Sequence, residues 1–162
     1  MKYIVNLFFL LSSTLGFSAS DSLPLPTNVA YRINMPSASL SFLSGMSWGV
    51  HETISHHYGA FENAIPYAND SYWDPSRSWK NKYRGGNPDS GEKFPGASTV
   101  FVSITDAKHL LTSIHRISYF AAGLTVMIGE KRPWWHYALD IGVSFISFSL
   151  GFHSMYTVLF SK

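Results

Sequence analysis

The sequence contains no cysteine among its 162 residues. This absence excludes disulfide bonds, thiolate catalysis and metal sites with cysteine ligands, although it does not indicate a compartment. Charge is also scarce, because only 14% of the residues are charged and the formal net charge is +2. A charge this small, with no basic run interleaved with aromatic residues, argues against nucleic acid as a partner. The sequence also lacks a nucleophile elbow, a phosphate-binding loop and internal repeats.

Apolar residues are abundant and unevenly distributed. Aromatic residues make up 16% of the chain, and the segment 137–160 has only Asp140 and His153 as ionisable groups. At about 1.5 Å per residue, a helix of this length crosses a bilayer core of about 30 Å. We therefore expect an all-α membrane helical bundle of about three helices, near residues 38–58, 98–128 and 134–160.

The remaining segments predict the domain organisation. Lys2, the apolar stretch after it and the small residues 18–20 are typical of a signal peptide, or of an uncleaved anchor, over residues 1–20. Residues 21–35 are expected to be a linker, and residues 36–162 the helical membrane domain. Within that domain, residues 63–97 are polar and rich in proline and glycine, yet they contain several aromatic residues. Because disordered segments are poor in aromatic residues, we expect an ordered cap on the membrane surface.

Small residues recur every four positions in the first predicted helix, at Ser41, Gly45, Gly49 and Thr53. A ridge of this kind lets two helix backbones approach closely in a membrane. It predicts a tightly packed helix.

Three carboxylate–histidine pairs have helical spacing: Glu52 with His56, Asp106 with His109, and His136 with Asp140. Residues three or four apart lie on one face of a helix. Ionisable groups in apolar helices are costly unless they pair, bind a metal or line a polar cavity, so these pairs are candidates for a functional site.

The first two pairs each have a functional and a structural interpretation. Glu52 and His56 are spaced as ligands of zinc, iron or manganese, although the pattern is not HExxH; alternatively they form a polar helix end bonded to the loop. Asp106 and His109 form a metal or acid–base dyad, or else a helix cap with an interior histidine. Further along that helix, Arg116 is expected to hold a phosphate or carboxylate.

Antiparallel packing would group the candidates at the cap end. His153 lies in an apolar run where an unpaired buried imidazole is costly, whereas His136 and Asp140 fall at the opposite membrane face, where a histidine tip is usually solvated. The predicted site, with Glu52, Asp106 and Arg116 as candidate catalytic residues, has five metal-binding candidates: Glu52, His56, Asp106, His109 and His153.

The D-x-x-H pattern of Asp106 and His109, followed by Leu110 and Leu111, resembles the start of a helix in VanZ-like and YfiM-like small bacterial membrane proteins. Ala107 stands where those proteins have lysine. The stretches HETISHHY, WDPSRSWKNKYRGG, STVFVSITDAKHLL and GFHSMYTVLF are also similar to small envelope proteins of Bacteroidetes-type bacteria. The resemblance implies a membrane location and a shared polar core. It implies no activity. We expect the bacterial cell membrane, specifically the inner membrane.

Our leading hypothesis is an envelope membrane protein with a polar site under the cap, acting as a metal-dependent hydrolase on a lipid-like substrate. The alternative is a non-enzymatic assembly or scaffold subunit. It would use the small-residue ridge and the tryptophan-rich loop to bind a membrane protein partner or a second copy of the chain. Proton or ion conduction along the polar residues is a third hypothesis.

Overall fold

The computed structural model describes residues 30–128 and 131–160. The predicted signal or anchor over residues 1–20 and most of the predicted linker lie outside the described residues. The described residues form helices and turns. They contain one isolated antiparallel bridge, between Tyr83 and Glu92, and no β-strand. The expected all-α class is therefore confirmed.

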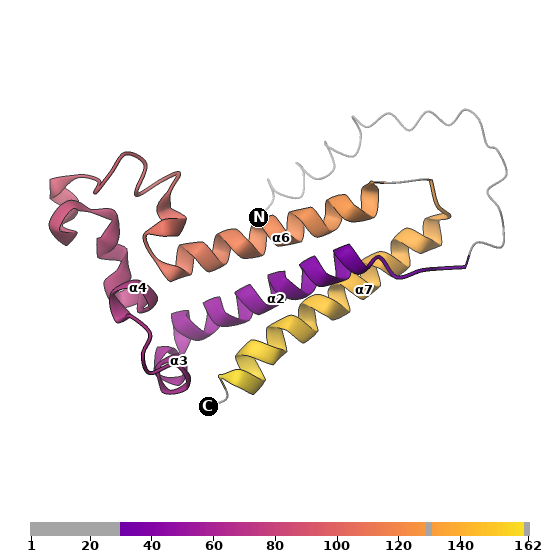
Figure 1. The fold of residues 1–162 in the computed structure, drawn as a ribbon, viewed down its shortest axis with the longest axis horizontal. Coiled ribbons are helices and arrows are strands. Elements are labelled where there is room, and N and C mark those ends of the chain that lie inside the picture. The colour runs from indigo at the N-terminus through magenta and orange to yellow at the C-terminus, as the bar shows by residue number, and fades with distance from the viewer. Residues whose placement is uncertain (1–29, 129–130, 161–162) are drawn as a thin grey trace, which may run out of the picture. The chain divides into compact units, whose positions relative to one another are not determined.

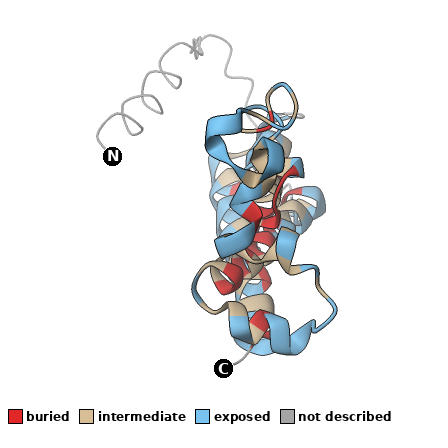
Figure 2. Ribbon diagram, turned by 90° about the vertical axis from the view of Figure 1, so that its left-hand side faces the viewer, coloured by how far each residue is buried: buried red, intermediate tan, exposed pale blue. Residues whose placement is uncertain are grey.

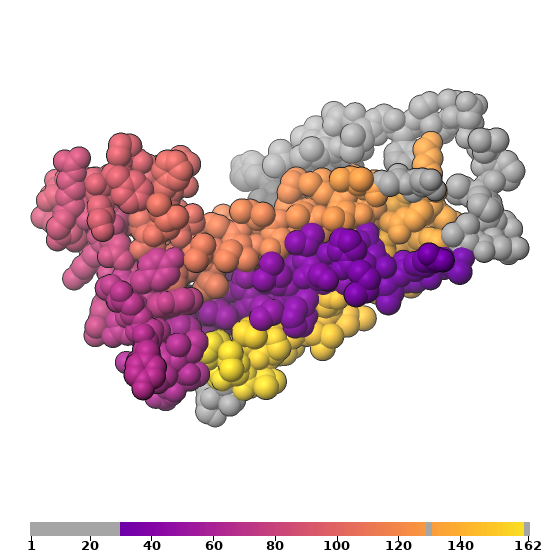
Figure 3. All heavy atoms as spheres, viewed as in Figure 1, coloured from indigo at the N-terminus to yellow at the C-terminus, as the bar shows by residue number. Residues whose placement is uncertain are grey.

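Three long helices form the main body of the described chain (Figure 1). They are α2 (Met35–His56), α6 (Ala107–Met127) and α7 (Trp134–His153), and η5 (Ser154–Leu159) continues α7 as a π-helix. Helix α2 packs against both α6 and α7 over most of its length, whereas α6 and α7 scarcely touch each other. The space-filling view shows α2, in indigo, between orange α6 and yellow α7 (Figure 3).

Short helices and turns connect α2 to α6. The main ones are α3 (Tyr58–Ala64), α4 (Asp70–Trp73), α5 (Pro75–Ser78) and the 3-10 turns η1 (Trp79–Lys82), η2 (Arg84–Gly86), η3 (Pro88–Ser90) and η4 (Val102–Ile104). Asn69 is the N-cap of α4, and its side chain accepts the Ser71 backbone N–H. Asp74 is the N-cap of α5 and accepts the Ser76 backbone N–H in the same way. We call residues 58–104 the cap segment.

The helix predicted over residues 98–128 begins later than expected. Residues 95–101 form turns, with Gly96 at a positive φ of 80°, and α6 starts at Ala107 after a capping aspartate, Asp106. The β-branched residues before Asp106 fold into the η4 turn instead. The start of α6 therefore lies at the junction with the cap segment.

Helices α2 and α7 cross with backbone against backbone. A Cβ atom added to Gly45 would lie 2.0 Å from the Phe148 carbonyl oxygen, and one added to Gly151 would lie 2.2 Å from the Phe42 carbonyl oxygen. Atoms cannot approach this closely, so only glycine fits at either position. The predicted small-residue ridge thus packs on α7 of the same chain, and this face of α2 is not open to another protein.

Hydroxyl groups, rather than apolar side chains, join α2 to α6. Ser37 Oγ donates to the Ala122 carbonyl at 3.1 Å and lies 2.9 Å from Ser144 Oγ of α7. One end of the contact is closed by Asn34, which caps α2 and donates to the Thr125 carbonyl at 2.9 Å. Further along, Ser44 Oγ bonds to His115 of α6.

The distribution of apolar residues is the reverse of that in a water-soluble bundle. Between the long helices the buried residues are mainly serine, glycine and alanine, whereas large apolar side chains of α6 and α7 are exposed, among them Ile117, Phe120, Ile141 and Phe145. Figure 2 shows buried positions along the middle of the helices and exposed ones outside. Buried large apolar residues instead gather where the cap segment meets the helices: Ile54, Phe61, Leu111 and Phe160. Trp134–Leu159 is, within the described residues, the one helix long and apolar enough to cross a membrane.

We predict that Gly45→Ala lowers the free energy of unfolding by about 1–3 kcal/mol, because the new methyl group pushes α2 away from α7. Gly142→Ala on α7 is the matched control, since nothing lies within 4 Å of a Cβ there. It should leave stability unchanged or raise it by about 0.5–1 kcal/mol through helix propensity. Unfolding of the purified protein, followed by circular dichroism, measures both; equal effects of the two variants would contradict the described α2–α7 contact.

Candidate functional site

Asp106 is the best-connected ionisable residue at the cap end of the helices. Its backbone is extended (φ −152°, ψ 153°), and its carboxylate accepts the His109 backbone N–H at 2.8 Å, which makes it the N-cap of α6. Its side chain is only 3% exposed. The helix cap of the structural alternative is therefore present, whereas His109, expected there to be an interior residue, is partly exposed.

The same carboxylate also holds the His109 ring. His109 Nδ1 lies 2.7 Å from Oδ1 and 2.9 Å from Oδ2 of Asp106, so the ring nitrogen donates to the carboxylate when it carries a proton. The His109 side chain is 40% exposed. A carboxylate on Nδ1 sets the tautomer and leaves Nε2 to accept a proton, which is the arrangement of an acid–base dyad.

A lysine from the cap segment completes this cluster. Lys82 Nζ lies 3.5 Å from Asp106 Oδ2, and its side chain is 15% exposed. Beside it, Asn81 Nδ2 donates to the Ser71 carbonyl at 2.6 Å and to the Thr105 carbonyl at 3.0 Å. Lys82 was missed in the sequence because it lies in an irregular segment, without the helical spacing that marked the carboxylate–histidine pairs.

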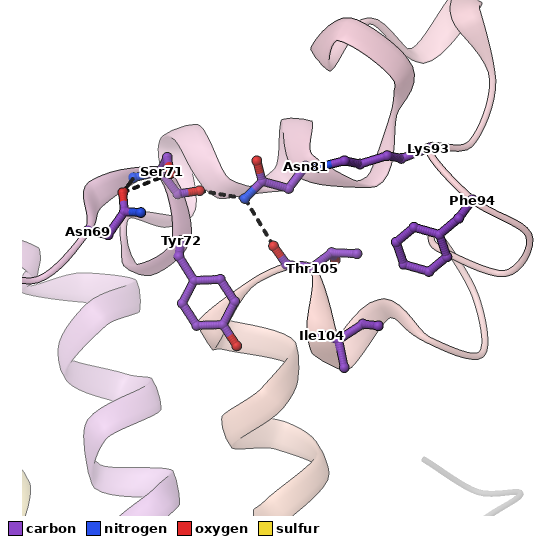
Figure 4. A pocket seen from close by; sticks show the side chains of 8 residues that line it. All are labelled: Asn69, Ser71, Tyr72, Asn81, Lys93, Phe94, Ile104 and Thr105. Atoms are coloured by element: carbon purple, nitrogen blue, oxygen red, sulfur yellow. Dashed lines mark hydrogen bonds between the residues drawn. The ribbon is translucent and has the colours of Figure 1, made fainter.

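A cavity of about 300 Å³ lies next to this cluster (Figure 4). Thr105, which precedes Asp106, and Tyr72 form part of its wall; the other lining residues are Asn69, Ser71, Asn81, Lys93, Phe94 and Ile104. Burial and the nearby Asp106 carboxylate raise the pKa of Tyr72 above its usual value, so its hydroxyl stays protonated near neutral pH. None of the described residues that line the cavity carries a carboxylate.

Glu52 pairs with histidines of its own helix. Its Oε2 lies 3.5 Å from His56 Nε2 and its Oε1 lies 3.4 Å from His51 Nδ1. The His51 ring is stacked on Trp48, with 4.5 Å between ring centroids, and His56 is 64% exposed. The predicted Glu52–His56 pair therefore exists at the end of α2.

The Glu52–His56 and Asp106–His109 pairs both form, but they do not join into one site. Within residues 30–128 and 131–160, no three or more histidine, aspartate or glutamate side chains are placed to hold one metal ion. The five candidates Glu52, His56, Asp106, His109 and His153 do not form one metal-binding group there. The binding of zinc, iron or manganese stays a prediction.

Two residues expected near the dyad lie elsewhere. His153 was expected to be buried in an apolar run, but it is exposed and its Nδ1 lies 3.1 Å from Thr157 Oγ1. The helix turns this position outward, and Thr157 is the hydrogen-bond partner of the ring. Arg116 is exposed and follows Asp106 by ten residues, or about 15 Å along the helix axis. The cation beside Asp106 is Lys82 instead.

The third pair also differs from expectation, because neither residue is solvated. Asp140 accepts from Tyr31 Oη at 2.8 Å and lies 2.8 Å from Arg132 Nη2, while its side chain is fully buried. His136 is 2% exposed and packs edge-on against the Tyr31 ring. This cluster ties the residues before α2 and the α6–α7 connection to α7, so we interpret it as structural.

Comparisons with known proteins found no matching protein family, no matching curated protein and no matching solved structure. The resemblance to VanZ-like and YfiM-like membrane proteins therefore stays a prediction.

We predict that Asp106→Ala lowers the free energy of unfolding by about 2–4 kcal/mol, since it removes the cap of α6 and leaves Lys82 without its buried partner. Asp106→Asn should cost less, because asparagine also caps helices. Denaturant unfolding in mild detergent measures both, with Asp89→Ala in an exposed turn as the control. Equal losses for the alanine and asparagine variants would show that capping contributes nothing.

Proposed function

We propose that this chain is an integral membrane protein with an acid–base site at the membrane surface, where Asp106 and His109 promote hydrolysis of a lipid-like substrate. The observation that carries the proposal is the reversed apolar distribution, in which small and polar residues are buried while large apolar residues face outward. In water such a surface would be unfavourable, because burial of apolar area is the main driving force of folding.

In a bilayer the same arrangement is expected. Lipid tails are as apolar as leucine side chains, so membrane helices associate through small residues and interhelical hydrogen bonds. Gly45 and Gly151 supply the close approach, and Ser37 and Ser44 supply the hydrogen bonds. Helix α7 with η5 is long and apolar enough to span, and we propose that α2 and α6 cross beside it.

The dyad fits acid–base chemistry on water. In this proposal His109 Nε2 removes a proton from a water whose oxygen bonds to the ester carbonyl carbon, and Asp106 holds the ring and stabilises the imidazolium that forms. The imidazolium then gives this proton to the leaving alcohol oxygen as the ester C–O bond breaks. Lys82 balances the charge of Asp106 from the other side. The exposed ring of His109 and the buried carboxylate behind it support these roles.

A lipid-like substrate is supported by where the dyad lies. Three apolar residues of the cap segment, Val100, Phe101 and Ile104, are exposed just before α6; we call them the apolar lip. Exposed apolar residues next to a membrane helix insert among the headgroups, so a lipid could reach the dyad without leaving the bilayer.

The absence of cysteine gives a direct test of membrane insertion. We predict that single cysteines replacing Ile117 and Phe145, which are 69% and 70% exposed, react slowly with a membrane-impermeant maleimide in opened membrane fragments. A cysteine at Tyr67, 98% exposed in the cap segment, should react fast. In lipid the reactive thiolate does not form, because a charge there is costly.

After denaturation in detergent all three cysteine variants should react alike, which controls for expression. Fast labelling of the Ile117 and Phe145 variants in intact fragments would contradict membrane insertion.

We predict that His109→Ala lowers kcat of lipid hydrolysis by about 10²–10⁴-fold, the usual contribution of a general base. The purified protein in nanodiscs would be assayed with a panel of phospholipids for released acid. His153→Ala is the control. His153 is the last residue of α7, its side chain is exposed, and among the described residues its one hydrogen-bond partner is Thr157. A five-residue metal site predicts equal loss in both variants.

Elemental analysis of protein purified without a histidine tag tests the metal prediction separately. Stoichiometric zinc, iron or manganese that disappears in His56→Ala and His109→Ala would support a metal-dependent mechanism over the dyad alone. If the His109→Ala variant still hydrolyses lipid, both the metal-dependent mechanism and the dyad mechanism are contradicted.

A further inference from the structure

The cavity beside the dyad is electrostatically suited to an anion. Among the described residues its wall contains Lys93 and the side-chain amide of Asn69, and none is a carboxylate. Both N–H groups of the Asn81 amide are already bonded to backbone carbonyls. In Figure 4 the Lys93 side chain extends along the wall toward Asn81. Among the described residues Lys93 takes part in no ion pair, whereas Lys82 is paired with Asp106. The positive charge of Lys93 is therefore available to a bound anion.

Backbone pairing places Lys93 beside Lys82. The Lys93 N–H donates to the Lys82 carbonyl at 2.8 Å. The neighbouring residues Tyr83 and Glu92 form an antiparallel bridge, so Lys82 and Lys93 lie opposite each other. Residues opposite each other in an antiparallel pair project to the same side. Both lysines thus project to the side of the start of α6, one toward the carboxylate of Asp106 and one along the cavity wall.

The nearest acidic residue in the sequence is Glu92, and its carboxylate is committed elsewhere. It accepts the Gly96 N–H at 2.8 Å and the Ser98 N–H at 3.1 Å, as well as the Ser98 hydroxyl. Hydrogen bonds from the Ser98 hydroxyl and these two N–H groups lower the pKa of Glu92. Glu92 therefore stays ionised and bound to its own loop, and it does not neutralise Lys93.

The other part of the cavity is apolar and continues onto the apolar lip. Phe94 and Ile104 line the cavity, and Ile104 is also 63% exposed with Val100 and Phe101 beside it in sequence. One end of a bound molecule would meet the lysine and the Asn69 amide, and the other end would meet apolar side chains. A molecule with an anionic head and a hydrocarbon tail matches both ends.

We infer that this cavity binds the phosphate headgroup of an anionic phospholipid, with Lys93 and Asn69 on the phosphate and the acyl chains leaving past Ile104. This inference rests on the proposed function, because it names the substrate class of the same site. The phosphate would lie next to Thr105, which lines the cavity and immediately precedes Asp106 in the chain. An ester of that lipid would then be presented to His109.

Lipid binding is measured without turnover, by native mass spectrometry of the full chain in mild detergent. Short-chain phosphatidylglycerol and diacylglycerol, which has the same acyl chains but no phosphate, serve as probes. We expect phosphatidylglycerol to bind about tenfold more tightly, since a charged hydrogen bond contributes on this scale. Lys93→Gln should remove that preference without changing diacylglycerol binding, and Lys93→Arg should retain it. Lys80→Gln, an exposed lysine of the cap segment outside the cavity, is the control and should retain it too.

Equal affinity for the two lipids, or an unchanged preference in Lys93→Gln, would overturn the inference. Competition with inorganic phosphate and with oleate identifies the chemistry: displacement by phosphate supports a phosphate site, and displacement by oleate alone would replace it with a carboxylate site and so overturn it. His109→Ala separates the two proposals. It should keep the preference for phosphatidylglycerol even if hydrolysis proves absent.

Discussion

The contact between the backbones of α2 and α7 is the constraint on which the rest of the structure depends. Gly45 and Gly151 allow each helix to meet a carbonyl of the other directly. Because α6 and α7 scarcely touch, α2 must hold both, and it uses glycine toward α7 and serine hydroxyls toward α6. Small residues on two faces of one helix leave no space for large side chains between the helices. The large apolar residues must then face outward.

This packing also explains where the apolar core lies. Ile54, Phe61 and Leu111 are buried at the junction of α2, α6 and the cap segment, beyond the region of close backbone contact. An apolar core there behaves as in a soluble protein, since burial from water drives it. The chain thus combines two packing regimes, and the proposed site lies where they meet. A substrate that is itself part polar and part apolar would encounter both.

The sequence predicted this structure in part. The long helices, the small-residue ridge and the pairing of Asp106 with His109 follow from local periodicity, and each was visible in residue spacing. Lys82 and Tyr31 were not predicted as partners of Asp106 and Asp140, because both come from irregular segments far away in the chain. The outward position of His153 was missed for a related reason. On a helix apolar on all sides, spacing alone does not tell which face is buried.

Two buried aspartates hold the ends of this structure, and the difference between them decides where chemistry is expected. Asp140 is enclosed by Tyr31 and Arg132, and its neighbour His136 is buried as well, so no proton acceptor there reaches solvent. Asp106 is equally buried, yet its partner His109 keeps 40% of its side chain exposed. A structural ion pair gains nothing from an exposed imidazole, whereas proton transfer to a substrate requires one. In the proposed mechanism Asp106 therefore combines a capping role, which holds α6 in place, with the orientation of the group that takes the proton.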